Sequence, residues 1–304
     1  MNDTIHQQDV YHLDKARVRA SFDRAANTYD AAAVMQKLVR EEMLSRLELV
    51  NLQASRILDA GCGTGKASVA LMQKYPKAQV ISLDLAMGML HKTQSTRTLS
   101  QRLKQSLGLG KQSALCADIE HLPLADGCLD MVWSNLAIQW CNDLDAVFSD
   151  MHRVLRTDGL LMFSTLGPDT LKELRAASSL DDEHIHVSRF IDMHDIGDAL
   201  VRAGFAAPVL DVERITLTYD DVISVMRDLK SIGAHNAADG RGRGLQGRGF
   251  LKQITENYQR FRKDGKLPAT FEVVYGHAWK PAARPKTKID LGAGLAPVTF
   301  HGKK

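Results

Sequence analysis

The stretch "ILDAGCGTGKA", residues 57–67, places three glycines at alternate positions behind Asp59, directly after two apolar residues that indicate the end of a buried strand. The glycines are Gly61, Gly63 and Gly65. Glycine costs backbone entropy, so three of them at alternate positions need a physical reason. Either the chain makes a tight structural turn here, or the backbone comes close to a ligand.

Apolar runs recur along the first half of the chain, and helix-like segments separate them. The runs cover residues 56–60, 78–84, 113–118, 129–135 and 159–166. The helical segments that stand out between them are 65–75, 86–105 and 143–156. Strands that alternate with helices predict an α/β fold, with a doubly wound, mostly parallel sheet. With the later strand signals we expect seven strands.

The flanking regions follow other patterns. Residues 15–47 predict one or two amphipathic helices, with breaks near Asn27 and Asp30. From Pro168 the alternation stops; later runs at 209–219 and 269–279 look like strands, and 250–263 looks helical. The expected division is N-terminal helices or lid (1–50), α/β core (51–167), helical insertion over the pocket (168–235), arginine-rich loop and last sheet elements (236–280) and flexible tail (281–304).

Composition excludes several classes. The chain has 304 residues, 44% of them hydrophobic, and a net charge of +3, too small to imply nucleic acid by itself. No apolar stretch is long enough to span a membrane, and the polar start indicates no secretory signal. The four cysteines, Cys62, Cys116, Cys128 and Cys141, are widely spaced, which favours a reducing cytoplasm. No cysteine or carboxylate completes a ligand set for His184, His186 and His194, so we expect no metal.

The glycine loop opens a helix, so backbone N–H groups and the positive helix end face whatever binds there. Its spacing is neither G-x-G-x-x-G nor that of a P-loop. Asp84 and Asp118 each close a later apolar run, and the carboxyl ends of parallel strands meet at one edge. Asp84 lies 19 residues beyond Gly65, which suits a carboxylate that accepts two ribose hydroxyls. The alternative is that these aspartates are helix caps or turn formers.

Residues 56–166 resemble the class I S-adenosylmethionine-dependent methyltransferases, whose fold is Rossmann-like. The resemblance implies that Gly61, Gly63 and Gly65 line the methionine part, Asp59 offsets the sulfonium charge, and Asp84 holds the ribose. It also implies that Leu85 and Met89 pack near the adenine and that Asp118 and Ile119 address its edge. Ser134 and Asn135, at the end of the fourth strand, complete the implied cofactor-binding set.

The acceptor side follows the fourth strand, where "NLAIQW" contains Gln139 and Trp140. It lacks the [ND]-P-P-[YF] run of base-methylating enzymes and resembles enzymes that methylate carboxylates. "ASFDRAANTYDAAAVMQ" and "MRDLKSIGAHN" with "GRGRGL" resemble the malonyl-[acyl-carrier protein] O-methyltransferase (BioC) family of biotin synthesis, over roughly residues 15–279. The resemblance implies methylation of a malonyl thioester on acyl-carrier protein. Trans-aconitate methyltransferase stays an alternative. So does an arginine-hydroxylating complex I assembly factor, which "LGPDTLKELR" and "ATFEVVYGHAWK" resemble.

A malonyl carboxylate is already ionised at neutral pH, so its methylation needs an orienting cation and a lid more than a base. Arg189, in "SRFID", is the predicted cation, and Tyr29 the predicted lid residue. Arg241, Arg243 and Arg248 suit the acidic surface of a carrier protein or its phosphopantetheine. The alternatives are a surface arginine, a core tyrosine and a merely flexible loop.

Overall fold

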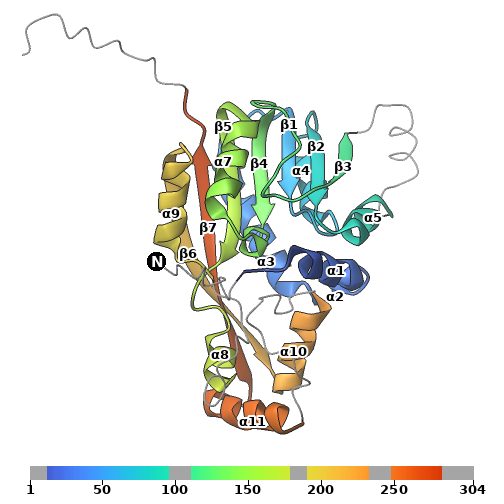
Figure 1. The fold of residues 1–304 in the computed structure, drawn as a ribbon, viewed down its shortest axis with the longest axis vertical. Coiled ribbons are helices and arrows are strands. Elements are labelled where there is room, and N and C mark those ends of the chain that lie inside the picture. Colours follow the sequence, from blue (N-terminus) through green and yellow to red (C-terminus); the bar gives the residue numbers. More distant parts are fainter. Residues whose placement is uncertain (1–11, 96–110, 179–189, 233–247, 283–304) are drawn as a thin grey trace, which may run out of the picture.

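The computed structural model describes residues 12–95, 111–178, 190–232 and 248–282 (Figure 1). Seven strands form one sheet in the order β3-β2-β1-β4-β5-β7-β6. Their bounds are β1 Arg56–Ala60, β2 Gln79–Asp84, β3 Gln112–Cys116, β4 Leu129–Asn135, β5 Leu155–Leu166, β6 Ala206–Tyr219 and β7 Leu267–Trp279. The first five strands pair in parallel, and β7 runs antiparallel to both of its neighbours. The predicted doubly wound, mostly parallel seven-stranded sheet is confirmed.

The apolar runs read from the sequence correspond to the strands because their side chains are buried. Strands β1 to β4 begin and end within two residues of the predicted runs. Strand β5 begins four residues before its run, at Leu155, because Leu155 pairs with Leu129 ahead of a register shift in β4. Polar Arg156, Thr157 and Asp158 form this early part of β5 and are exposed, so hydropathy gave no sign of it.

Helices lie on both faces of the sheet and next to the carboxyl ends of its parallel strands (Figure 1). Their bounds are α1 Lys15–Ala25, α2 Tyr29–Ala32, α3 Val34–Glu48, α4 Lys66–Lys74, α5 Met87–Ser95, α7 Leu144–Val154, α8 Lys172–Ser178, α9 Met193–Arg202, α10 Val222–Ser231 and α11 Arg248–Tyr258. Short 3-10 turns cover Ile138–Trp140 (η1) and Gln259–Phe261 (η2). Asp14, Asp143, Asp192 and Asp221 cap helix N-termini with their carboxylates. The predicted break near Asn27 is confirmed, whereas Asp30 lies inside α2 and the second break falls at Ala33.

The segment 168–235 is not a wholly helical insertion, which corrects that part of the sequence interpretation. Helices α8 and α10 are extra elements, but β6 is the edge strand of the main sheet and α9 packs between β6 and α7. Strand β6 contains the run 209–219 that the sequence already indicates as a strand, and most of its residues alternate between half-buried and exposed, as in an edge strand with one covered face.

Strands β6 and β7 continue as a two-stranded ribbon beyond the end of β5. Their pairing runs on to Tyr219 and Leu267, whereas β5 stops pairing with β7 at Leu166 and Val273. Helices α8, α10 and α11 gather around this ribbon in the lower part of Figure 1. The ribbon and these helices therefore form a lobe next to the carboxyl ends of the parallel strands.

Candidate active site

The three loop glycines all adopt left-handed backbone conformations, but they differ in what a side chain at each position would meet. A Cβ on Gly61 (φ +78°) would lie 2.2 Å from the Cβ of Ala137, and one on Gly65 (φ +81°) 2.5 Å from Thr93 Cγ2. A Cβ on Gly63 (φ +53°) would meet nothing closer than Tyr29 Cε1, at 3.8 Å. Two of the glycines are thus required by packing within the protein, and the third leaves space open to a ligand.

Two buried carboxylates support this loop. Asp84 accepts the backbone N–H of Gly63 on Oδ2 and that of Ala86 on Oδ1, both at 2.8 Å. Asp59 accepts the Ser68 hydroxyl at 2.5 Å. Burial raises the pKa of Asp59 to about 7 and that of Asp84 to about 6. Both carboxylates are therefore poised to favour a nearby positive charge or hydrogen-bond donor.

Beside the loop lies a cavity that we call the glycine-loop cavity. Helix α1 closes one side of it with Lys15, Val18 and Phe22. The other walls include Tyr29, Gly61, Gly63, Asp84, Leu85, Met89, Asp118, Ile119 and Asn135. Predicted cofactor residues from four strand ends thus line one cavity, whose walls are largely apolar apart from two aspartates.

Helix α1 is tied to this cavity by contacts that the sequence did not reveal. Lys15 Nζ lies 3.1 Å from Asp118 Oδ1 and 3.0 Å from Glu120 Oε2. Phe22 meets Trp140 edge-on, with ring centroids 5.3 Å apart. Trp140 therefore borders the glycine-loop cavity, beside the predicted cofactor residues.

A second cavity, the Arg40 cavity, continues past the loop toward helix α3. Arg40 lines it together with Asp59, Gly63 and Asn135. The Arg40 side chain is 19% exposed, and its ion pair among the described residues is a long 3.9 Å contact with Glu41. The Arg40 guanidinium, which has only this weak ion pair among the described residues, therefore lines the same cavity as Gly63.

Two polar residues at the end of β4 differ in orientation. The Ser134 hydroxyl is fully buried and donates to the Ala60 carbonyl at 2.9 Å, so its side chain does not reach either cavity, contrary to prediction. Asn135 does line both cavities, and its amide is fixed: Oδ1 accepts from Ser164 at 3.0 Å, and Nδ2 donates to the Gln36 carbonyl at 3.1 Å. Ser164 is a positioning residue that sequence reasoning missed.

A third cavity, the Arg175 cavity, adjoins the first through Cys141 and extends toward the lobe. Gln139 and Thr165 line it where predicted acceptor residues belong, and Arg175 of α8 forms part of its wall. The predicted cation Arg189, and Arg241 and Arg243, lie outside the described residues. Arg248 begins α11, and its side chain is likewise not described. Gly65 contacts Thr93 and lines none of the three cavities.

Five cations at these cavities were absent from the predicted site: Lys37 and Lys66 of the Arg40 cavity, and Lys15, Arg40 and Arg175. The last three had no signal in the sequence. Each lies on a helix outside the strand–loop pattern, where a charged residue looks like any other exposed helical residue. No signal in a single sequence separates Arg40 from Arg46 on the same helix. Among the described residues, no group of three His, Cys, Asp or Glu side chains gathers as a metal site. None of the described helices is long and apolar enough to cross a membrane.

Comparison with known proteins agrees with this geometry. A family model described as a methyltransferase domain matches residues 58–163. The YcgJ protein from Bacillus subtilis has a similar fold, with a TM-score of 0.56 and 15% identity over 80% of this chain and 99% of that one. The sheet order, the loop and this match define a class I methyltransferase, with S-adenosylmethionine as the methyl donor.

Whole-length relatives narrow the class. The malonyl-[acyl-carrier protein] O-methyltransferase of Methylovorus sp. (strain MP688) is 67% identical over 96% of this chain and 97% of its own. That of Laribacter hongkongensis (strain HLHK9) is 59% identical over 96% and 98%. The chain belongs to the malonyl-[acyl-carrier protein] O-methyltransferase family.

Proposed function

We propose that this protein transfers the methyl group of S-adenosylmethionine to the free carboxylate of a malonyl thioester on acyl-carrier protein. The product is the malonyl methyl ester that starts pimeloyl and biotin synthesis. The observation that carries the proposal is the 67% identity to a malonyl-[acyl-carrier protein] O-methyltransferase along 96% of the chain.

The residues of the first two cavities fit the donor. Gly63 leaves the backbone open, Asp84 offers oxygens to ribose hydroxyls, and Leu85 and Met89 supply apolar walls for an adenine. Asp118 and Ile119 border the same wall. At the other end, Asp59 suits a positive charge and Arg40 suits the carboxylate of the methionine part. The bound donor would supply an activated methyl group on a sulfonium sulfur.

Methyl transfer to a carboxylate breaks a C–S bond and forms a C–O bond, with no proton transferred. The protein therefore has to orient the carboxylate and remove its water shell. Gln139 and Thr165 lie at the adjoining cavity, and Tyr29 lies over Gly63. Burial raises the pKa of the Tyr29 phenol well above its ordinary value, so its hydroxyl stays protonated and can donate a hydrogen bond. We propose that the Tyr29 side chain covers the bound methyl donor.

We place the carrier protein on the side of the lobe. Arg241 and Arg243 precede α11 in the sequence, Arg248 begins it, and α11 packs in the lobe beside α8. Arginines suit the phosphate of phosphopantetheine and an acidic carrier surface. We place the reaction in the cytoplasm, since all four cysteines are free thiols, as in reducing compartments.

Methyl transfer with labelled donor tests the proposal. We expect labelled ester from malonyl-carrier protein and none from trans-aconitate or from donor alone. The gene should also restore growth without biotin to a strain that lacks this methyltransferase, whereas its Asp84→Ala variant should not. Methylation of trans-aconitate in place of the malonyl thioester would overturn the proposal, as would an unmutated protein that binds donor but methylates neither acceptor.

A further inference from the structure

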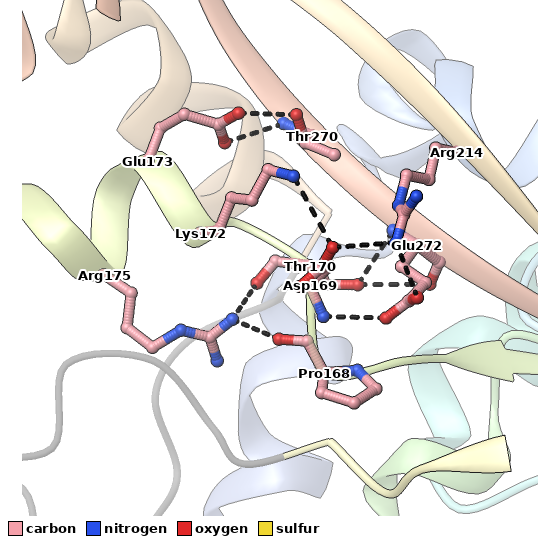
Figure 2. A network of polar contacts seen from close by, with 9 residues as sticks. All are labelled: Pro168, Asp169, Thr170, Lys172, Glu173, Arg175, Arg214, Thr270 and Glu272. Atoms are coloured by element: carbon pink, nitrogen blue, oxygen red, sulfur yellow. Dashed lines mark hydrogen bonds and ion pairs between the residues drawn. The ribbon is translucent and has the colours of Figure 1, made fainter.

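Arg175 is held at the wall of the Arg175 cavity by two backbone carbonyls. Its Nη2 donates to the carbonyl of Thr170 at 2.8 Å and to that of Pro168 (Figure 2). Both carbonyls belong to the turn that follows β5, which also leads from Thr165 into α8. One end of the guanidinium is thereby fixed.

The turn that holds Arg175 is itself fixed by strand β7. Glu272 accepts the backbone N–H of Asp169 at 2.7 Å, and Arg214 bridges the two carboxylates from β6, at 3.0 Å from Asp169 and 3.7 Å from Glu272. Figure 2 shows these residues around the turn. A Cβ on Gly167 would come within 2.6 Å of Glu272 Oε2, so the chain passes directly against this carboxylate.

Helix α8 has a second anchor on its other side. Glu173, only 5% exposed, accepts the hydroxyl of Thr270 at 2.5 Å and its backbone N–H at 3.1 Å. Glu173 and Arg175 thus leave α8 in different directions, one into the lobe and one toward the turn (Figure 2). The helix that carries Arg175 and the turn that holds its guanidinium are therefore both anchored to β7.

The guanidinium has donors that no described residue uses. Nη2 is used by the two carbonyls, whereas Nε and Nη1 have no partner among the described residues, and no described carboxylate pairs with Arg175. Asp192 and Asp195 also line the cavity, but Asp192 is engaged by the backbone and ring of His194. An arginine at a cavity wall whose Nε and Nη1 no described residue engages suits an anionic group, which it can hold with a charge-assisted hydrogen bond.

We infer that Arg175 binds the carboxylate of the methyl acceptor in this cavity, an inference that rests on the proposed function. The cavity meets the glycine-loop cavity at Cys141, and Gln139 and Thr165 lie between the loop and α8. A carboxylate held here would have its polar neighbours in Gln139 and Thr165. The same donors could hold a phosphate of the carrier's prosthetic group, so the experiment has to separate the two anions.

Initial rates on two acceptors distinguish a carboxylate site from a phosphate site. The acceptors are malonyl-carrier protein and a short malonyl thioester of N-acetylcysteamine, which has no phosphate. Arg175→Ala should raise KM for both acceptors by about ten- to hundredfold. Its affinity for S-adenosylhomocysteine, measured by calorimetry, should stay unchanged. Arg175→Lys should raise KM less than Arg175→Ala does, since lysine keeps the positive charge but not the planar guanidinium.

Arg260→Ala is the matched control, because Arg260 also donates to an α8 carbonyl, that of Ala176 at 2.8 Å, but does not line the cavity. Its KM values should stay normal. If Arg175→Ala does not fold, Arg175→Gln replaces it, since it keeps N–H donors for the turn without a charge.

Normal KM values in the Arg175 variant that folds would overturn the inference, and so would a rise confined to the carrier-bound acceptor, which would indicate a phosphate site. A shared fall in melting temperature in the Arg175 and Arg260 variants without a change in KM would mean a structural role and also overturn it. If the unmutated protein methylates neither acceptor, the proposed function fails instead.

Discussion

The Asp84 carboxylate accepts the backbone N–H of Gly63 at 2.8 Å, so the residue proposed to hold the ribose also fixes the glycine loop. Its other oxygen accepts from Ala86, at the start of the turn into α5. One side chain thus links the ends of β1 and β2 on the side where the cavity opens.

Replacing Asp84 should therefore weaken donor binding through two effects. We expect Asp84→Ala to lose about 1.5 to 3 kcal/mol of binding free energy for S-adenosylhomocysteine from the charged hydrogen bonds, with a further loss from the loosened loop. Calorimetry measures it. Asp130→Ala is the control: Asp130 accepts the N–H groups of Ser55 and Arg56 at 2.6 and 2.7 Å, but at the opposite edge of the sheet. Equal losses of affinity in both variants would argue against a ribose contact.

Donor affinity should depend on pH through the same carboxylate. Burial raises the pKa of Asp84 to about 6 in the ligand-free protein, and a ribose hydroxyl needs the ionised form as acceptor. The contribution of Asp84 to S-adenosylhomocysteine binding should be complete well above pH 6 and fall as the pH drops through 6, approaching about tenfold per unit. In Asp84→Asn this dependence should be reduced to the part due to Asp59. An unchanged slope in that variant would assign the titration to another group.

The loop glycines should separate stability from binding. We expect Gly61→Ala to lower the free energy of unfolding by about 2 to 5 kcal/mol, from left-handed strain and overpacking against Ala137. The double variant Gly61→Ala, Ala137→Gly should regain the overpacking share. Gly63→Ala should lower the free energy of unfolding by only about 1 to 2 kcal/mol, from left-handed strain. It should nevertheless weaken S-adenosylhomocysteine binding, because the added methyl group enters the space left for the ligand. Denaturant unfolding and calorimetry test this, and no recovery in the double variant would contradict the packing explanation.

Arg40 should recognise the amino-acid end of the donor. Arg40→Ala should weaken S-adenosylhomocysteine about ten- to hundredfold while leaving 5′-methylthioadenosine, which lacks the carboxylate, unchanged. Arg46→Ala is the control on the same helix, since Arg46 is already paired with Glu42 and Asp211, each at 2.8 Å. If both ligands weaken equally in Arg40→Ala, the residue supports the fold of the cavity and does not bind the carboxylate.

The three arginines that precede or begin α11 should act on the carrier alone. Replacing Arg241, Arg243 and Arg248 with alanine should raise KM for malonyl-carrier protein, most strongly at low salt, because exposed charges are screened beyond about 8 Å at physiological ionic strength. KM for the short thioester should not change. Arg189→Ala should instead reduce turnover of both acceptors at unchanged donor affinity, and normal turnover of both would remove Arg189 from the site.

The sequence by itself determined the sheet and the donor-binding edge. The alternation of apolar runs with helical segments, the glycine spacing and an aspartate at a strand end are local signals. Strands β1 to β4 could therefore be predicted from the sequence, and so could the position of Asp59, Asp84 and Asp118 at the carboxyl ends of the strands. The early start of β5 was not predicted, since Leu155 joins the sheet by pairing with Leu129 while Arg156 and its neighbours are exposed and polar.

The tertiary structure decided which side chains face the cavities. Ser134 turns to the Ala60 carbonyl, and Trp140 packs on Phe22 of a helix that precedes it by more than a hundred residues in the chain. Arg175 reaches its cavity because Glu272, on a strand near the end of the chain, fixes the turn beneath it. These orientations depend on partners distant in sequence, and hydrogen bonds and packing between such partners leave no periodicity that a single sequence can display.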